Sequence, residues 1–553
     1  MKKYIFENKD LTKSFTILVG VLAVMFRLCL SYTQFATIYP PLAPIDDDLM
    51  TRAAMSIVNG EWLGEYSYLT ISKHAFFAVW LAFLHVLGVP LLVGNMALWA
   101  FASLCAASAL APAIKKRYAR LGLFLLLLYN PAASACYATR IYRDAIFPSL
   151  CLIFFSGVIG AGLRYKENIK QLLPYYAMYG VSFGCVYLCR EDGVWVLPFF
   201  AVAFLIVEAL LIAEKQPFVK KAASMLLPFA ASAVIICLYC RQNYTHYGRF
   251  IVSDFTSKEF KSAYGAMTSL KQDGWDPMVA VPSDVREDLY ANIDFFAPVK
   301  QALEDPLLKG GYYNEKHGDF TSGAFYWALR RALSDLGYYE NAQTSKEYYE
   351  KLTLEIQSLV DGGILETQNG SNRLRKSVTP PIKAEYVPAV LAETFAGFRC
   401  VIGFSQCDPL AERAVGTEEE INPVADFINQ QGATAWIPYT DTPYLSPVRA
   451  VTHAFMRAVR VIYSVLIPIM LAITAMWQIK TLLADISAKT FNSDSFLNIV
   501  LLGVIGMALL RCRMIAFVEV SSFGIGTYVM YLSTVHPLVL LYSFIGTAKT
   551  FEY

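Results

Sequence analysis

The stretch that decides the fold is SFTILVGVLAVMFRLCLSYTQFATI, residues 14–38, followed closely by PPLAPIDDDLM, residues 40–50. An apolar run of about 20 residues is long enough to cross a bilayer as a helix. No small-residue cleavage site follows it, so we expect a retained first membrane span rather than a removed signal peptide. Three consecutive aspartates beside this span need an explanation, because carboxylates close to hydrocarbon are costly.

The whole chain has the composition of a polytopic membrane protein. Of its 553 residues, 56% are hydrophobic and 17% are charged, which is more apolar than a soluble core of this size would be. The formal net charge of +2 gives no overall field that would attract nucleic acid. The six histidines are scattered, so no structural zinc site is expected. Cys400 and Cys407 could form a disulfide.

The distribution of lysine and arginine predicts the topology. About ten spans are expected, at residues 14–36, 90–114, 121–139, 145–163, 173–190, 194–213, 222–240, 454–478, 495–511 and 522–546. With the N-terminus in the cytoplasm, the basic clusters at 115–117, 164–170, 215–221 and 480–489 all fall on the cytoplasmic side, as the positive-inside rule requires. We therefore predict a mainly α, polytopic transmembrane helical bundle in the plasma (inner) membrane.

Two further regions complete the predicted organisation. Residues 74–88 are apolar but too short to span comfortably, and with 49–58 they are expected to form two interfacial helices in a first outer loop, 37–89. In residues 243–452 charge density rises and long apolar runs vanish, which indicates a separate, largely helical extracytoplasmic domain. The predicted modules are thus 1–242, 243–452 and 453–553.

Charged residues gather at the predicted outer ends of the spans. They are Asp46, Asp47, Asp48, Lys73 and His74 in the first outer loop, Arg140, Arg143 and Asp144 in the second, Arg190, Glu191 and Asp192 in the third, and Arg511, Arg513 and Glu519 beside the late spans. Charges near hydrocarbon usually mark a polar cavity or a substrate path. Carboxylates and several cations at one depth suggest a site that handles an anionic headgroup and needs a base.

Each of these charges also has a purely structural interpretation. One aspartate, with Asp48 as the candidate, could cap the helix that begins near Leu49. Lys73 could extend its ammonium group to the interface. The second-loop arginines could anchor the end of a span, and residues 190–192 could neutralise one another. Because all of these would have to coincide on one face, a functional cluster is favoured.

The residues around these charges resemble a known superfamily. The acidic run precedes a pattern A..I..G.WLG.Y, residues 54–66, and the stretch LTISKHAFFAVW, residues 69–80. Further along are YNPAASACYATRIYRDAIFPS (129–149), LCREDGVWVLPF (188–199) and FVEVSSFGIGTYVMYLSTVHPLVLLY (517–542). Together these stretches resemble the GT-C glycosyltransferases, which include protein O-mannosyltransferases and the aminoarabinose transferases of lipid A. The resemblance covers most of 1–240 and 454–546 and leaves the outer domain unmatched.

The resemblance implies an inverting glycosyltransferase that moves a sugar from a polyprenyl-phosphate donor to an acceptor on the outer face of the membrane. By position, Asp46 corresponds to the residue that activates the acceptor hydroxyl, with Asp47 beside it. The acidic run here is Asp-Asp-Asp where Asp-Glu is commoner, so either aspartate could be the base. Donor phosphate contacts are expected from Lys73, Arg143, Arg190, Arg511 and Arg513, and other substrate contacts from Tyr66, His74, Asp144, Glu191 and Glu519.

The cofactor and the partners follow from the same chemistry. No cofactor is certain, although Asp46, Asp47 and Asp48 could together bind a divalent cation such as Mg²⁺ or Mn²⁺. The expected partners are the lipid-linked donor, the membrane, and a glycan, lipid or protein acceptor. The outer domain would cover the site and select the acceptor, for example through the aromatic stretch 323–342.

Functions from other classes stay open. A secondary transporter would share the spans and edge charges, but it would be expected to have two similar halves and interrupted helices near the midplane. A non-catalytic surface-polysaccharide assembly protein would use the outer domain for binding and would tolerate loss of the aspartates. A polysaccharide polymerase or ligase would also take lipid-linked sugars, usually as diphosphates.

Overall fold

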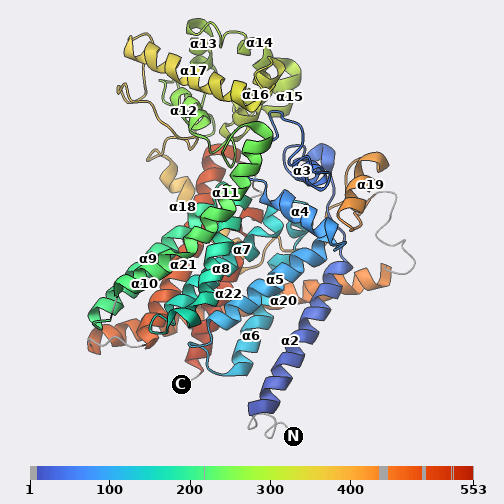
Figure 1. Ribbon diagram of the computed structural model, residues 1–553, viewed down its shortest axis with the longest axis vertical. Helices are drawn as coiled ribbons and strands as arrows, with labels where there is room; N and C mark the ends of the chain where they lie inside the picture. Colours follow the sequence, from blue (N-terminus) through green and yellow to red (C-terminus); the bar gives the residue numbers. More distant parts are fainter. Residues whose placement is uncertain are drawn as a thin grey trace.

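The computed structural model describes residues 9–216, 218–434, 446–488, 493–524, 526 and 529–551. These residues are mainly helical, and their named strands form one short hairpin, β1 (Tyr313–Asn314) with β2 (Asp319–Phe320). Figure 1 shows a bundle of long helices with a smaller helical domain at one end, while α2 begins and α22 ends at the other. The predicted fold class, a mainly α polytopic bundle with a separate helical domain, is confirmed.

The bundle contains seven helical segments long and apolar enough to cross a membrane, within the described residues. Its helices are α2 (Lys9–Tyr32), α5 (Leu91–Ala109), α6 (Arg117–Leu128), α7 (Phe147–Gly162), α8 (Ile169–Cys189), α9 (Leu197–Ala213), α10 (Phe218–Leu226), α11 (Pro228–Tyr247), α20 (Ser446–Ala488), α21 (Ser493–Val518) and α22 (Val535–Thr550). In the most apolar windows of α2 and α20 only 17% and 22% of the residues are buried by the rest of the chain. Such apolar, uncovered faces are suited to lipid.

Three of the ten expected spans, 121–139, 145–163 and 522–546, correspond to helices of fewer than 18 residues. The expected helix 121–139 ends at Leu128, and 3₁₀ turns follow at Pro131–Ser134 and Cys136–Thr139. Proline at 131 disfavours helical backbone at the residue before it, which explains this end. The expected helix 522–546 begins only at Val535, because Gly524 and Gly526 have positive φ and interrupt it. The third short helix is α7.

The first loop connects α2 to α5 and carries two helices, as predicted. They are α3 (Asp47–Val58) and α4 (Phe76–Val86), with a 3₁₀ turn at Pro40–Leu42 before them. Between α3 and α4 the chain has no regular structure, and this segment packs against the large domain. The depth of the two helices in a bilayer stays a prediction.

The large domain has a core of its own, built by residues 258–374. Its helices are α12 (Lys258–Met267), α13 (Ser283–Asn292), α14 (Val299–Leu303), α15 (Pro306–Tyr312), α16 (Ser322–Asp335) and α17 (Ala342–Asp361). Helix α17 is amphipathic, and its apolar face enters this core. Figure 1 shows the domain beyond the end of α11.

The chain then returns to the bundle. Helix α18 (Tyr386–Ile402) packs against α21, and α19 (Glu418–Phe427) lies beside the first loop, where the rings of His85 and Phe427 stack at 4.3 Å. Both Cys400 and Cys407 are free thiols, so the disulfide considered from the sequence is not formed. Cys407 instead lies 3.7 Å from Nε2 of His536, across the bundle.

The basic connections gather at the end of the bundle opposite the large domain. Arg164, after α7, donates at 2.8 Å to the carbonyl of Ala109 at the end of α5. Lys166 pairs at 2.9 Å with Glu214 at the end of α9. The connections at 115–117, 164–170 and 215–221 therefore lie on one side (Figure 1). Lys489 of the last predicted cluster lies outside the described residues.

Close helix packing depends on glycine at a few positions. A Cβ at Gly157 of α7 would lie 2.7 Å from the backbone oxygen of Tyr175 and 2.7 Å from the nitrogen of Tyr179, both in α8. Small residues that let helix backbones approach are typical of membrane bundles, where no hydrophobic force drives the helices together. Helix α8 ends at Cys189, directly before the charged residues 190–192. Its contact with α7 therefore helps to fix the position of those residues.

We therefore expect Gly157→Ala to destabilise the protein. The added methyl group meets backbone atoms that cannot turn aside, and overpacking of this kind costs about 1–3 kcal/mol. Thermal unfolding of the purified protein in detergent measures the effect. Gly506→Ala in α21 is the matched control, because a Cβ there meets nothing within 4 Å. Equal unfolding temperatures for the two variants would show that the α7–α8 contact is not close-packed.

Candidate active site

Three adjacent carboxylates at the start of α3 point to three different cations. Asp46 precedes the helix and pairs with Lys73, which lies three residues before the first residue of α4. Asp47 accepts two hydrogen bonds from the guanidinium of Arg140, at 2.6 and 3.2 Å. Asp48 pairs at 2.8 Å with Arg52 one helical turn later. Successive residues of a helix point about 100° apart, which explains why the run divides in this way.

This divergence decides two of the alternatives left by the sequence. No aspartate side chain caps α3: Asp46 occupies the cap position without a side-chain cap hydrogen bond, and Asp48, the expected cap, lies inside the first turn. A divalent cation needs several oxygens directed at one point, and here each carboxylate is directed at its own cation. Within the described ranges no three His, Cys, Asp or Glu side chains gather around a metal position. The proposed Asp46–Asp48 metal site therefore does not fit.

The segment between α6 and α7 (129–146, the second connection) and the segment between α8 and α9 (190–196, the third connection) add buried ion pairs at the same end of the bundle. Arg143 contacts Glu191 at 2.7 Å, and Glu191 also accepts a hydrogen bond from the backbone nitrogen of His74 at 3.0 Å. Arg190 contacts Asp144 at 2.7 Å and Asp192 at 2.9 Å. Arg511 of α21 reaches Asp192 at 2.5 Å. Segments far apart in sequence are thus joined by charge.

We call the ten residues of these pairs the charge cluster. Its cations are Lys73, Arg140, Arg143, Arg190 and Arg511, and its carboxylates are Asp46, Asp47, Asp144, Glu191 and Asp192. With five charges of each sign the cluster is formally neutral. Neutrality is expected where charges are withdrawn from water, because an unpaired buried charge is strongly destabilising.

The ring of Tyr142 lies at the centre of three of these cations. Lys73 Nζ is 5.5 Å from the ring centroid, and the guanidinium carbons of Arg140 and Arg143 are 5.3 and 5.4 Å away. Cations are attracted to the face of an aromatic ring, more strongly where water is excluded. Tyr142 is itself buried. It therefore lets three like charges approach each other around a neutral group.

Four carboxylates of the cluster have a perturbed pKa: burial raises the pKa of Asp47 in spite of Arg140, whereas the pKa values of Asp46, Glu191 and Asp192 lie below the ordinary range. Burial by itself disfavours the charged form of Asp46, but the ammonium of Lys73 outweighs it and holds the pKa of Asp46 below its ordinary value. Burial likewise opposes ionisation of Glu191, and the nearby Arg143 and His74 together bring the pKa of Glu191 well below its ordinary value. Both groups are therefore carboxylates at neutral pH.

Exposure distinguishes the two candidate bases. The side chain of Asp47 is 3% exposed, while that of Asp46 is 30% exposed. Asp47 is also held by two hydrogen bonds from a rigid guanidinium, whereas Asp46 faces a single flexible ammonium. Asp46 is thus the carboxylate that a ligand from outside can reach.

Several residues expected at the site lie elsewhere. Arg513 is exposed, because it is two positions from the buried Arg511 on α21 and so faces away from it. Glu519 accepts a hydrogen bond at 2.5 Å from the backbone of Gly526 after the π-helical turn Glu519–Phe523. Tyr66 contacts Ser345 of the large domain at 2.9 Å. The other expected residues, including His74, Asp144 and Glu191, lie in or directly beside the charge cluster.

Two aromatic residues at the site were not singled out from the sequence. Tyr142 lies between Arg140 and Arg143 in the stretch RIYRD, residues 140–144. An aromatic residue between two arginines could have been recognised from the sequence as a candidate cation contact. Trp327 of the large domain lies with its ring 5.2 Å from Lys73 Nζ. No local pattern could have paired residues this far apart, and only the stretch 323–342 as a whole was expected to face the site.

Comparisons with known proteins give two matches among solved structures. ArnT from Cupriavidus metallidurans in the apo state is 12% identical, with 97% of this chain and 78% of that chain covered and a TM-score of 0.32. The same protein bound to undecaprenyl phosphate is 11% identical, with 95% and 77% covered and a TM-score of 0.27. No family model and no curated protein matches the sequence.

We expect Glu191→Gln to destabilise the protein strongly. The change leaves Arg143 buried without a charged partner, and breaking such a pair costs about 3–5 kcal/mol. Glu366→Gln is the control, because Glu366 and its partner Lys271 are 70% and 65% exposed and such a pair contributes below about 1 kcal/mol. Unfolding temperatures of the two variants test this difference. Similar shifts would mean that the charge cluster does not stabilise the fold.

Proposed function

We propose that this protein is a membrane glycosyltransferase that moves a sugar from a polyprenyl-phosphate donor to an acceptor hydroxyl with inversion. The observation that carries the proposal is the position of Asp46, a partly exposed carboxylate held beside Lys73 and the Tyr142-centred cations. A base and a set of cations at one end of an apolar bundle are what displacement of a lipid phosphate from a sugar requires. The motif resemblance to the GT-C glycosyltransferases supports the same chemistry.

Asp46 accepts the proton of the acceptor hydroxyl as the acceptor oxygen forms a bond to the anomeric carbon. The bond from that carbon to the phosphate oxygen breaks, and its electron pair leaves with the polyprenyl phosphate. Negative charge grows on the leaving oxygen, where preorganised cations in a water-poor site stabilise it better than water does. Lys73 and Arg143 are proposed for that task, with Arg190 and Arg511 supporting from the far side of the cluster.

The neutrality of the charge cluster adds an order to this mechanism. An arriving phosphate must take a cation from one of the carboxylates. Asp46 is the most exposed of them, and its partner Lys73 has a flexible stem, so their pair is the one that opens. Release from Lys73 removes the charge that lowers the pKa of Asp46 and makes it a stronger base. Asp47 is held by Arg140, and we propose that it positions this guanidinium and does not accept the proton.

We further propose that the charge cluster and the large domain face the outside of the cell. The basic connections at the opposite end of the bundle support this orientation, because lysine and arginine are concentrated in cytoplasmic loops. The lipid tail of the donor would then lie along the bundle while its sugar reaches Asp46.

Replacement of the proposed base gives the direct test. We expect Asp46→Asn to retain donor binding and to lower the rate of transfer by about 10²- to 10⁴-fold, the usual contribution of general base catalysis. The assay uses purified protein and the glycosylated polyprenyl phosphate that mass spectrometry finds co-purified with it. Asp48→Asn is the matched control, since Asp48 pairs with Arg52 outside the cluster. Full transfer by the Asp46 variant would exclude its role as base.

Lys73→Ala addresses the donor instead. Loss of the ammonium is expected to weaken binding of undecaprenyl phosphate by at least about 10-fold, the scale of one charge-assisted contact. Titration of the lipid into the purified protein in nanodiscs measures this. Unchanged affinity would remove Lys73 from the donor site.

Orientation can be measured independently of activity. A cysteine introduced at Lys271, in the large domain, should react with a membrane-impermeant maleimide in intact cells. One introduced at Lys116, between α5 and α6, should react only after permeabilisation. Both positions are exposed in the fold. The reverse labelling pattern would place the charge cluster on the cytoplasmic side and end the proposed outer-face reaction.

A further inference from the structure

The large domain makes direct contact with the segment that carries Lys73. Between α3 and α4 this segment has no regular structure, and residues outside the bundle hold it through several interactions. Tyr66 contacts Ser345 at 2.9 Å, and Arg330 donates to the carbonyl of Tyr68 at 2.8 Å. The backbone nitrogen of Asp254 donates to the carbonyl of Ile71 at 2.8 Å. The hydroxyl of Tyr326 donates to the carbonyl of Ser72 at 3.2 Å.

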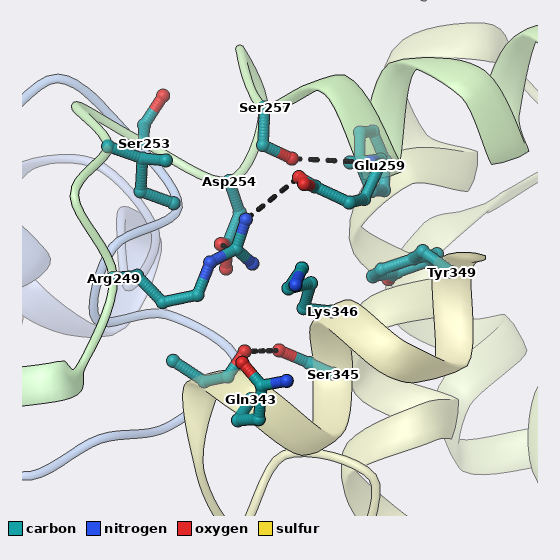
Figure 2. A network of polar contacts seen from close by, with 12 residues as sticks. Arg249, Ser253, Asp254, Ser257, Glu259, Gln343, Ser345, Lys346 and Tyr349 are labelled. Carbon is teal, nitrogen blue, oxygen red and sulfur yellow. Dashed lines mark hydrogen bonds and ion pairs between the residues drawn. The ribbon is translucent and has the colours of Figure 1, made fainter.

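One of these contacts comes from the junction between α11 and the large domain, residues 248–257, and the other three come from helices of the large domain itself. Figure 2 shows this junction: Arg249 points to Glu259, with Asp254 next to it and Ser345 on the facing helix α17. Arg330, completely buried, also reaches Asp254 at 3.2 Å. A buried arginine with its charge partner fixes the geometry tightly, because either group alone would be costly. These contacts therefore fix the position of the first loop relative to the large domain.

The ammonium of Lys73 is held by three groups from three regions of the chain. Asp46 of the first loop accepts from it, the ring of Tyr142 lies 5.5 Å away, and the ring of Trp327 lies 5.2 Å away. Trp327 is in α16, the same helix as Tyr326 and Arg330. Asp46 is the one charged partner of Lys73 among the described ion pairs. If that pair opens, two aromatic faces remain to hold the ammonium in place.

We propose that Trp327 is a positioning residue for Lys73, so that the large domain forms part of the donor phosphate site. The inference rests on the donor role proposed for Lys73 and deepens it. A lysine side chain has four rotatable bonds, and an ammonium released by its carboxylate would otherwise turn toward water. The indole face attracts a cation without neutralising it. Lys73 thus keeps its charge and its direction while it exchanges Asp46 for a phosphate oxygen.

The test uses the full-length protein in nanodiscs and undecaprenyl phosphate as the probe. Trp327→Leu removes the ring, and we expect its Kd for the lipid to rise by about 5- to 10-fold, the range for a partly desolvated cation–ring contact. Trp327→Phe keeps an aromatic face and should stay within about 2-fold of the wild-type protein. Trp275→Leu is the matched control. Its ring lies 4.7 Å from Lys383, far from the charge cluster in sequence and contact, and it should leave the Kd unchanged.

A double-mutant cycle separates positioning from a merely structural effect. If Trp327 acts through Lys73, Trp327→Leu should weaken binding in the wild-type background and add nothing in a Lys73→Met background. An equal loss in both backgrounds would mean that Trp327 touches the lipid or maintains the fold, and would overturn the inference. Unchanged binding by Trp327→Leu would overturn it as well, leaving the donor role of Lys73 intact. Absence of lipid binding by the wild-type protein would instead remove that role and the inference with it.

Fluorinated tryptophan at position 327 extends the test if the leucine variant does not fold. Fluorine withdraws electron density from the ring face and changes its volume little, so each added fluorine should raise the Kd stepwise. A structural role would not respond in this graded way. A constant Kd across the fluorinated series would overturn the proposed positioning.

Discussion

The structure depends on pairing charges that are largely withdrawn from water. Five cations and five carboxylates meet at one end of the bundle, and each has a partner of opposite sign. The pairs connect the first loop to the second connection, the second to the third, and the third to α21. Loops between membrane helices would otherwise be the least constrained parts of the chain. Here the need to neutralise each charge determines how they fold on one another.

The fold class could be predicted because its signals are local. Hydrophobic runs give the positions of the helices, and the basic residues divide the connections into two groups. The ends of helices were harder. Helix α6 ends at Leu128 rather than at the expected residue 139 because of Pro131, and α22 begins late because of two glycines with positive φ. These breaks lie inside apolar stretches, where hydropathy continues although the backbone changes conformation.

The candidate site shows the same division. Charged residues at the ends of spans could be expected to meet, and most of those named from the sequence do lie together. Arg513 does not, because a helix directs residues two apart to different sides and the buried one had to be chosen. The partner of each aspartate could not be predicted either, since it depends on angles around the first turn of α3. The contact between Trp327 and Lys73 could not be predicted, because the two residues lie far apart in the sequence and no local pattern relates them.

The neutrality of the charge cluster has a consequence for how a substrate would arrive. Opposite charges a few ångströms apart cancel each other at longer range, so the site projects little attraction into the surrounding water. A soluble nucleotide sugar would not be steered toward it from solution. A molecule anchored in the bilayer needs no such guidance, because diffusion in two dimensions along the helices already delivers its headgroup to the right height. Under the proposed function, the lipid anchor of the donor would therefore bring it to the site along the membrane, without long-range attraction through water.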